Sequence, residues 1–437
     1  MKKLNLIYVF AAILLVSCES GGGGQLIGVQ GRMPWYQPDP YGMLYLPMGS
    51  FVMGPNDQDV PYAHTSKAKT VSVQAFYMDQ TEITNNEYRQ FVDWVKDSII
   101  HRILGEEHDE GHFITEDQYG FEIDPPQIDW DMRIDNEDPE IREILNEQMY
   151  LPEHERFYKR REIDTRKLDF EYYWIDLKDA AQKGPQGEPL RQRGKTDRSI
   201  FIKRDVINVY PDTLCWIHDF TYSFNEPMTN MYFWHPAYDE YPVVGITWKQ
   251  ARAFSIWRTQ LLNSYLSAFG SAYVQDFRLP TESEWEYAAR GGLRLSPYPW
   301  GGPYIRNSRG CFLGNFKPLR GNYIDDGGFH TVRVTSYSPN DFGLYCMAGN
   351  VAEWTSNAFD EASYDFAHDL NMDYTYEAKD DDAPVLKRKV IRGGSWKDVG
   401  YYLQTSTRTY EYQDTSKSYI GFRNVMSYLG RAIGDDL

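Results

Sequence analysis

The feature that most constrains this fold is a helix-start pattern that occurs three times in a chain with few long periodic helices. Thr84 to Glu87, Thr247 to Gln250 and Thr281 to Glu284 each place a threonine three residues before an acid or an amide. This spacing is typical of the capping box, in which two side chains satisfy free amides at the start of a helix. Because tyrosine and tryptophan are abundant in the chain, the sequence predicts a loop-rich body with an aromatic core.

Regular elements are expected around these boxes. Met43 to Met53 and Val71 to Asp79 are β-like and are interrupted by glycine and proline. The helices that follow Thr84 and Thr247 should each bury one apolar stripe, and Gly291 should stop the third helix. The stripes consist of Tyr88, Phe91, Val92 and Val95 in the first helix and Ala251, Phe254, Ile256, Trp257 and Leu261 in the second.

The first 17 residues have the organisation of an export signal. Two lysines precede about a dozen apolar residues, too few for a spanning helix, which needs about 20. The run ends in Leu15-Val16-Ser17-Cys18, which resembles the bacterial lipobox. The sequence therefore predicts a signal peptide at residues 1–17, lipid on Cys18 and a tether through residue 40. The alternative is an ordinary signal peptide with a chance cysteine.

Charge and cysteine content exclude several classes of protein. The net charge of −18 argues against a nucleic-acid partner. No stretch after the N-terminal run is apolar enough to cross a membrane. If Cys18 carries lipid, then Cys215, Cys311 and Cys346 can form at most one disulfide, so the chain is not a disulfide scaffold.

Residues 101–240 are expected to form a long insertion between two parts of a folded body, residues 41–100 and 241–428, with a tail at 429–437. The segment is charged and aromatic, and it contains a Gly/Pro-rich patch at Gly184 to Pro189. Within it, Ser199 to Phe220 alternates between apolar and polar residues and is expected to form strands.

Seven segments, in order along the chain, resemble the signature segments of the formylglycine-generating-enzyme (sulfatase-modifying factor) superfamily. The resemblance covers residues 41–95 and 241–428 and leaves the insertion unmatched. It implies an α+β, C-type-lectin-like fold with little regular secondary structure. The segments are Met48 to Gly54, Thr81 to Asn85, Arg278 to Gly292, Asn340 to Tyr345, Gly349 to Trp354, Arg392 to Trp396 and Ile420 to Arg423.

The copper chemistry of the oxidases in this superfamily is not expected here. Those members bind copper through two cysteines between the Gly-Gly-Ser-Trp and Gly-Phe-Arg segments, because copper(I) needs soft thiolates. Lys397 to Tyr419 contains no cysteine. Asp398 stands at the first cysteine position, and the spacing to Arg408 is too short to place the second. The sequence therefore predicts a chain that is not an enzyme and requires no cofactor.

Iron-dependent members of the superfamily need three histidines. His108 and His112 are four residues apart, as two ligands on one helix face would be. Gly111 lies between them, however, and no third histidine follows nearby. The pair is expected to lie in a solvated loop.

The resemblance also implies structural calcium, which is held by carboxylate, amide and backbone oxygens. Cys346 stands where the family usually has Asp or Asn, and loss of that oxygen should weaken one of two candidate sites. The alternative for both sites is a pair of ordinary turns. The candidate ligands are Asn315, Phe316, Asp326 and Gly328 for the first site, and Gly349, Val351 and Glu353 for the second.

Segments between Gly28 and Met43 and from Cys311 to Pro318 resemble lipoproteins of the gliding-motility and type IX secretion machinery. This implies a structural protein that is lipid-anchored in the outer membrane and faces the periplasm. It would self-associate into a ring with a GldN/PorN-type periplasmic protein, near the outer-membrane translocon and the motor proteins GldL and GldM. The insertion would carry the ring contacts, or else cover the vacated active-site groove. The alternatives are a sister gliding lipoprotein, a metal-dependent oxidase and a glycan-binding member of the superfamily.

Overall fold

The computed structural model describes residues 37–55, 67–117, 119–176, 180–181, 198–219, 227–318 and 327–430. The expected signal peptide, Cys18, most of the tether, Asp326 and residues 431–437 lie outside the described residues. Residues 39–430 form one compact unit. No helix in the described part of the chain is long and apolar enough to span a bilayer.

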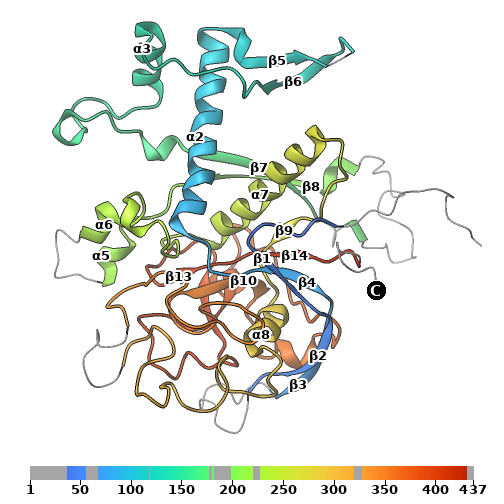
Figure 1. Cartoon of the computed structure of the whole chain (residues 1–437). Coiled ribbons are helices and arrows are strands. Elements are labelled where there is room, and N and C mark those ends of the chain that lie inside the picture. The colour runs from blue at the N-terminus through green and yellow to red at the C-terminus, as the bar shows by residue number, and fades with distance from the viewer. Residues whose placement is uncertain are drawn as a thin grey trace, which may run out of the picture. The chain divides into compact units, whose positions relative to one another are not determined.

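Two four-stranded sheets form the centre of this unit (Figure 1). The first is antiparallel throughout and has the order β1-β4-β14-β9, while the second has the order β12-β11-β10-β13 with β10 and β13 parallel. Three two-stranded sheets pair β2 with β3, β5 with β6 and β7 with β8. The strands are β1 Met43–Leu46, β2 Gly49–Met53, β3 Lys69–Val73, β4 Phe76–Asp79, β5 Phe113–Glu116, β6 Glu122–Ile128, β7 Asp169–Ile175, β8 Ile202–Asn208, β9 Phe277–Arg278, β10 Ala352–Ala358, β11 Arg388–Arg392, β12 Thr409–Tyr412, β13 Ile420–Gly421 and β14 Val425–Ser427.

All three predicted helix starts are confirmed. In each helix the threonine side chain accepts a hydrogen bond from the backbone amide of the residue three positions on. The side chain of that residue in turn accepts a hydrogen bond from the backbone amide of the threonine. Gly291 ends α8 in the left-handed conformation, with φ 56°, as predicted. The helices are α2 Asn85–Glu107, α3 Pro139–Gln148, α5 Cys215–Asp219, α6 Pro227–Met231, α7 Trp248–Ala268, α8 Glu282–Arg290 and α9 Ser363–Phe366, with short 3₁₀ turns at Glu110–His112, Phe157–Lys159, Thr165–Lys167, Arg198–Phe201, Pro236–Tyr238 and Pro384–Lys387.

The predicted β segments are present, but each is divided between two sheets. The segment Met43 to Met53 forms β1, which pairs with β4, and β2, which pairs with β3. Pro47 separates the two strands because it has no amide to donate to a ladder. Together with the helices, these sheets confirm the predicted α+β fold.

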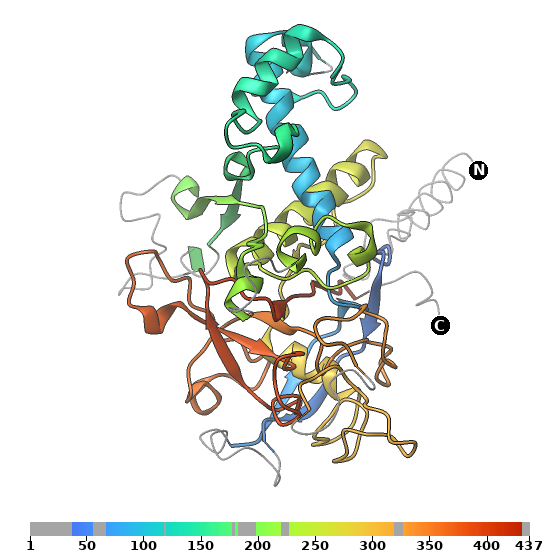
Figure 2. The ribbon, with the colours of Figure 1, turned by 90° about the vertical axis from the view of Figure 1, so that its left-hand side faces the viewer.

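The helix α2 runs without a break through residue 100, where the insertion was expected to begin. Figures 1 and 2 show α2 rising from the sheets and carrying α3 and the β5–β6 hairpin at its far end. We call residues 101–117 and 119–168 the arm. The rest of the insertion returns to the sheets, where the β7–β8 hairpin packs against α7.

The prediction of strands from Ser199 to Phe220 is right for its first half and wrong for its second. Ile202–Asn208 forms β8, but Cys215–Asp219 is the helix α5. Asp212 begins the change, because its carboxylate accepts the amide of Leu214 at 2.9 Å and turns the chain. Cys215 and Trp216 then bury one side of a short helix.

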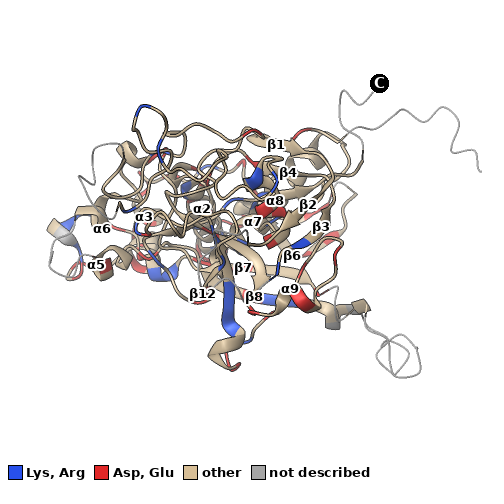
Figure 3. Ribbon diagram, turned by 90° about the horizontal axis from the view of Figure 1, so that it is seen from below, with Lys and Arg blue, Asp and Glu red and all other residues tan. Residues whose placement is uncertain are grey.

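One aromatic core joins the arm to the sheets. Phe91 of α2, Phe254 of α7 and Trp354 of β10 are buried in the same cluster as Leu145 of α3. A phenylalanine buried in this way contributes roughly 1.5–3 kcal/mol. Figure 3 shows blue and red segments scattered along the ribbon among tan, so basic and acidic residues are interspersed over the described elements.

Candidate functional site

The helix α8 carries two carboxylates into a buried ion network. All residues from Glu282 to Arg290 are buried. Glu286 accepts hydrogen bonds from the Gly54 amide at 2.8 Å and from Arg290 at 2.6 Å, and it also pairs with Arg392. Because buried charges need partners on every side, this network holds α8 against β11 and the end of β2.

A second buried network lies between the two sheets. The Glu82 carboxylate accepts the Asn350 side chain at 2.6 Å and the Val351 amide at 3.1 Å. Burial, and secondarily the neighbouring Glu353 carboxylate, raises the pKa of Glu82 well above its usual range. Glu353 in turn pairs with both ends of the Arg423 guanidinium, at 2.6 and 2.7 Å. These acids stabilise the fold through bonds within the chain.

Two residues of the cysteine-free stretch from Lys397 to Tyr419 are held by bonds within the chain. The Asp398 carboxylate accepts the Ser395 hydroxyl at 2.6 Å, and burial raises the pKa of Asp398. Arg408 donates to Glu282 at 2.5 Å and to the Ser363 hydroxyl at 3.0 Å. Neither residue offers the soft sulfur ligand that copper(I) requires.

The first candidate calcium site is brought together in part. The Asn315 amide group donates to the His330 carbonyl at 2.7 Å and accepts the Gly328 amide at 3.2 Å. Phe316 is buried in an adjacent aromatic cluster, and Asp326 lies outside the described residues. Calcium at this site stays a prediction.

The second candidate site has its carboxylate engaged elsewhere. Glu353, besides its pair with Arg423, accepts the Trp285 indole N–H at 2.7 Å. The Gly349 amide donates to the Gly393 carbonyl at 3.0 Å, and Val351 directly precedes β10. Where the family usually has an oxygen ligand, the Cys346 thiol donates to the Val334 carbonyl at 3.3 Å. Within the described residues, no group of three or more His, Cys, Asp or Glu side chains is arranged to hold a metal.

The prediction that His108 and His112 lie in a solvated loop is wrong for His112. His112 is 1% exposed, and its Nδ1 lies 2.9 Å from Nδ1 of His101 in α2. Asp109 caps the turn that carries His112 and folds it back onto α2. No local sequence pattern indicated His101, because its partner His112 is eleven residues away and lies across a reversal of the chain. His108 caps the end of α2 and lies close enough to His112 to interact with it electrostatically.

Three cysteines within the described residues are free thiols: Cys215 and Cys346 are buried, and Cys311 is exposed. Burial raises the pKa of both buried thiols, so they behave as small apolar side chains rather than as nucleophiles.

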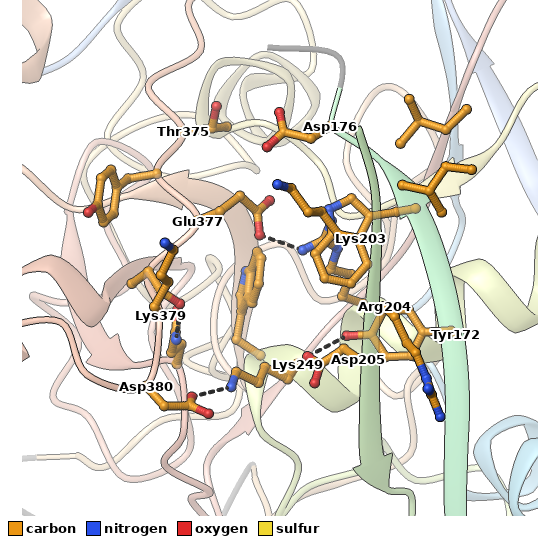
Figure 4. A pocket seen from close by; sticks show the side chains of 18 residues that line it. Tyr172, Asp176, Lys203, Arg204, Asp205, Lys249, Thr375, Glu377, Lys379 and Asp380 are labelled. Carbon is orange, nitrogen blue, oxygen red and sulfur yellow. Dashed lines mark hydrogen bonds and ion pairs between the residues drawn. The ribbon is translucent and has the colours of Figure 1, made fainter. Parts of the chain in front are cut away.

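The structure also forms a pocket that the sequence did not indicate. It has a volume of about 910 Å³ and lies between the β7–β8 hairpin, the start of α7 and the segment Thr375 to Asp380 (Figure 4). Arg252 donates to Glu377 at 2.6 Å, and Lys249 donates to Asp380 at 2.8 Å across its lining. Its walls come from distant parts of the sequence, so no local motif marks it.

Comparison with known protein families identifies the family to which this chain belongs. The model of the FGE-sulfatase family, described as the sulfatase-modifying factor enzyme 1-like domain, matches residues 36–428. The chain belongs to this family. The bounds of the match enclose residues 101–240.

The relatives include both inactive and active proteins. An inactive C-alpha-formylglycine-generating enzyme 2 of Bos taurus is 34% identical over 203 residues, which is 45% of this chain and 53% of that protein. The chain thus spans about half the length of this relative. A formylglycine-generating enzyme of Bos taurus is 24% identical over 407 residues, 91% of this chain and 78% of that protein.

Among solved structures, PvdO from Pseudomonas aeruginosa matches at 16% identity and a TM-score of 0.45, over 90% of this chain and 98% of that one. CarF matches at 16% identity and a TM-score of 0.39, over 89% of this chain and 98% of that one.

Proposed function

We propose that this chain is a non-catalytic, lipid-anchored component of the type IX secretion and gliding-motility machinery, of the kind called GldK or PorK. The observation that carries the non-catalytic part is the absence of cysteine from Lys397 to Tyr419, where Asp398, at the expected first cysteine position, is bonded to Ser395. A superfamily fold that keeps its core but lacks its thiolate ligands retains a rigid scaffold without the oxidase chemistry.

The lipobox at Cys18 supports an anchor in the outer membrane, with the folded body facing the periplasm. Several acyl chains at about 0.8 kcal/mol per buried methylene would make this anchoring effectively permanent. The segments that resemble the secretion lipoproteins support the particular machine, in which the chain self-associates into a ring with a GldN/PorN-type partner. GldL and GldM would energise that ring, and the sister lipoprotein GldJ is the nearest alternative role.

Exposed apolar side chains on the arm support its role as a contact surface. In the β5–β6 hairpin, Tyr119 is 75% and Phe121 70% exposed, and Ile114 is also exposed. Clustered aromatic side chains in solvent are typical of protein interaction sites. The arm is therefore assigned the ring or GldN contacts.

The test is gentle detergent extraction of native membranes, a pull-down on this chain, and mass spectrometry with electron microscopy of the eluate. GldN-type partners in ring-shaped particles are the expected result. A lone monomer that carries a transition metal would contradict the proposal and favour the oxidase alternative. A Cys18→Ser chain should remain soluble after membranes are pelleted.

The arm can be tested by replacing Tyr119 and Phe121 with serine. The double variant should no longer bind the GldN-type partner or assemble into rings. Its melting temperature should equal that of the wild type, because both side chains are exposed. Tyr304→Ser, at a position 76% exposed outside the arm, is the matched control and should assemble normally. An unchanged yield of rings from the double variant would contradict the assignment of the ring or GldN contacts to the arm.

A further inference from the structure

The pocket beside the β7–β8 hairpin has an unpaired strand edge along one wall. β7 and β8 form a two-stranded sheet, and no other strand of the described residues pairs with β8. The Asp176 amide donates to the Phe201 carbonyl at 2.8 Å, which fixes the alternation of the ladder. The main chains of Lys203 and Asp205 therefore face β7, while the main chains of Ile202, Arg204 and Val206 face away.

Side chains take the place of a neighbouring strand at two points of this edge, and at one of them the Asn208 carbonyl accepts the Gln250 side chain at 2.9 Å. The Val206 amide donates to the carboxylate of Asp205, at 3.0 Å. An exposed edge of this kind is a template for another chain.

Consecutive residues line both sides of the pocket. Ile202 to Asp205 form one side and Thr375 to Asp380 the other, around a volume of about 910 Å³. Consecutive residues of both strands line the pocket, Trp174 to Asp176 as well as Ile202 to Asp205, so the pocket extends past one face of this sheet to its end, where the outward-facing main chains of Ile202 and Arg204 lie. Figure 4 shows the hairpin along one side of this space and the Thr375 to Asp380 segment along the other.

The wall opposite β8, the segment Thr375 to Asp380, is held in place by hydrogen bonds from residues outside this segment. The Lys389 ammonium donates to the Tyr376 carbonyl at 2.7 Å, and the Gln413 side chain donates to the Ala378 carbonyl at 3.0 Å. Lys389 is buried, and burial lowers its pKa to about 8. A wall fixed in advance reduces the ordering cost of binding.

We propose that this pocket binds an extended polypeptide segment of another protein, which adds to β8 as a third strand. Strand addition supplies main-chain hydrogen bonds, and pockets for alternate side chains supply selectivity. The proposal goes beyond the scaffold role, which concerns the anchor and the arm, and it can stand or fall separately.

The lining defines the kind of segment. Tyr172, Trp174 and Trp248 offer aromatic contacts, and Trp174 also lines an adjoining cavity of about 720 Å³. The charges nearly balance, and several are already paired, so a strongly charged ligand gains little. An uncharged or weakly charged segment with apolar side chains at alternate positions fits. The charged lining residues are Lys203, Arg204, Lys249, Arg252 and Lys379 against Asp176, Asp205, Glu377 and Asp380.

The experiment uses the full chain in detergent to select from a phage-displayed library of random short peptides. The most enriched peptide is synthesised together with versions N-methylated on one or the other set of alternate amides. Methylation of the set that faces β8 should weaken binding roughly tenfold, and methylation of the other set should change it little.

Two substitutions at one position separate main-chain from side-chain recognition. Arg204→Pro removes an edge amide that is not part of the β7–β8 ladder, so the hairpin should persist and peptide binding should be lost. Arg204→Ala keeps that amide and should bind within about threefold of wild type. If the proline variant does not fold, the methylated peptides decide the question.

Failure to enrich any peptide would overturn the proposal. Equal losses for the two Arg204 variants, or equal effects of the two methylation patterns, would do the same. So would displacement of the selected peptide by chitotetraose, because the aromatic pocket would then be a carbohydrate site.

Discussion

The sheets around α8 and the arm around α2 are stabilised in different ways. Around α8, carboxylates and guanidinium groups pair inside the protein, and Glu286 alone accepts from Gly54, Arg290 and Arg392. In the arm most buried contacts are aromatic and aliphatic, and the buried polar groups include the His101–His112 pair and the Asp164 carboxylate, which accepts from Arg166 at 2.8 Å. The paired charges around α8 hold the sheets in one packing arrangement, whereas the arm leaves apolar side chains exposed at its end.

The largest expected effect is the loss of a buried charge near α8. Glu286→Gln leaves Arg290 and Arg392 short of a partner and should lower the free energy of unfolding by about 3–5 kcal/mol. Urea denaturation measures this loss. Lys96→Ala, which breaks a surface pair with Asp93, is the control and should cost at most about 1 kcal/mol. Similar losses of unfolding free energy in the two variants would show that the buried network contributes no more to stability than a surface ion pair.

The next effect concerns packing in the arm. Leu145 is fully buried between α3 and the shared core, so Leu145→Ala should cost about 2–5 kcal/mol. Ile114→Ala, on the exposed hairpin, should stay within about 0.5 kcal/mol of wild type. Hydrogen exchange then locates the loss: faster exchange in α3 with β10 unchanged would mean that the arm unfolds as a separate unit.

A smaller effect compares the helix starts of the two regions. Thr281→Ala in α8 and Thr84→Ala in α2 each remove a cap and should each cost about 1 kcal/mol in thermal unfolding. Serine at either position keeps the hydroxyl and should restore most of the loss. A cost at Thr84 far above that at Thr281 would show that the arm depends on the first turn of α2.

The smallest effect is a pH dependence confined to the arm. Burial lowers the pKa of His101 and of His112 from 6.5, against the opposing charges of Asp97, Asp109 and Asp129. The unfolded chain therefore binds more protons below pH 6.5, so the contribution of the pair is full above that pH and falls as the pH decreases.

Hydrogen exchange of α2 at pH 7 and pH 5.5 tests this dependence, with β10 as the internal reference. Replacing both histidines with glutamine should abolish the difference between the two pH values. An equal acceleration in β10 would contradict a local origin.

Local patterns predicted what depends on a few adjacent residues. The capping boxes at Thr84, Thr247 and Thr281 and the stop at Gly291 follow from side chains that satisfy nearby amides, and all are present. Alternation predicted β8 as well, but it failed after Asp212, where one side-chain bond redirected the chain.

The sites formed by residues far apart along the chain could not be predicted from the sequence. His112 was placed in solvent because its partner His101 lies across a chain reversal. The pocket beside β8 joins residues near 203 to residues near 377, and no spacing rule links them. The absence of cysteine between Lys397 and Tyr419, in contrast, could be read directly from the sequence, because it depends only on residue identity.

The continuous helix α2 has a mechanical consequence. Its 23 residues measure about 34 Å at 1.5 Å per residue, with no proline to bend it. A rod of this kind transmits displacement, so a tilt of a few degrees at its base moves the far end by a few ångströms. Force applied to the tip would in turn act as torque on Tyr88 and Phe91, whose rings are wedged among the aromatics of α7.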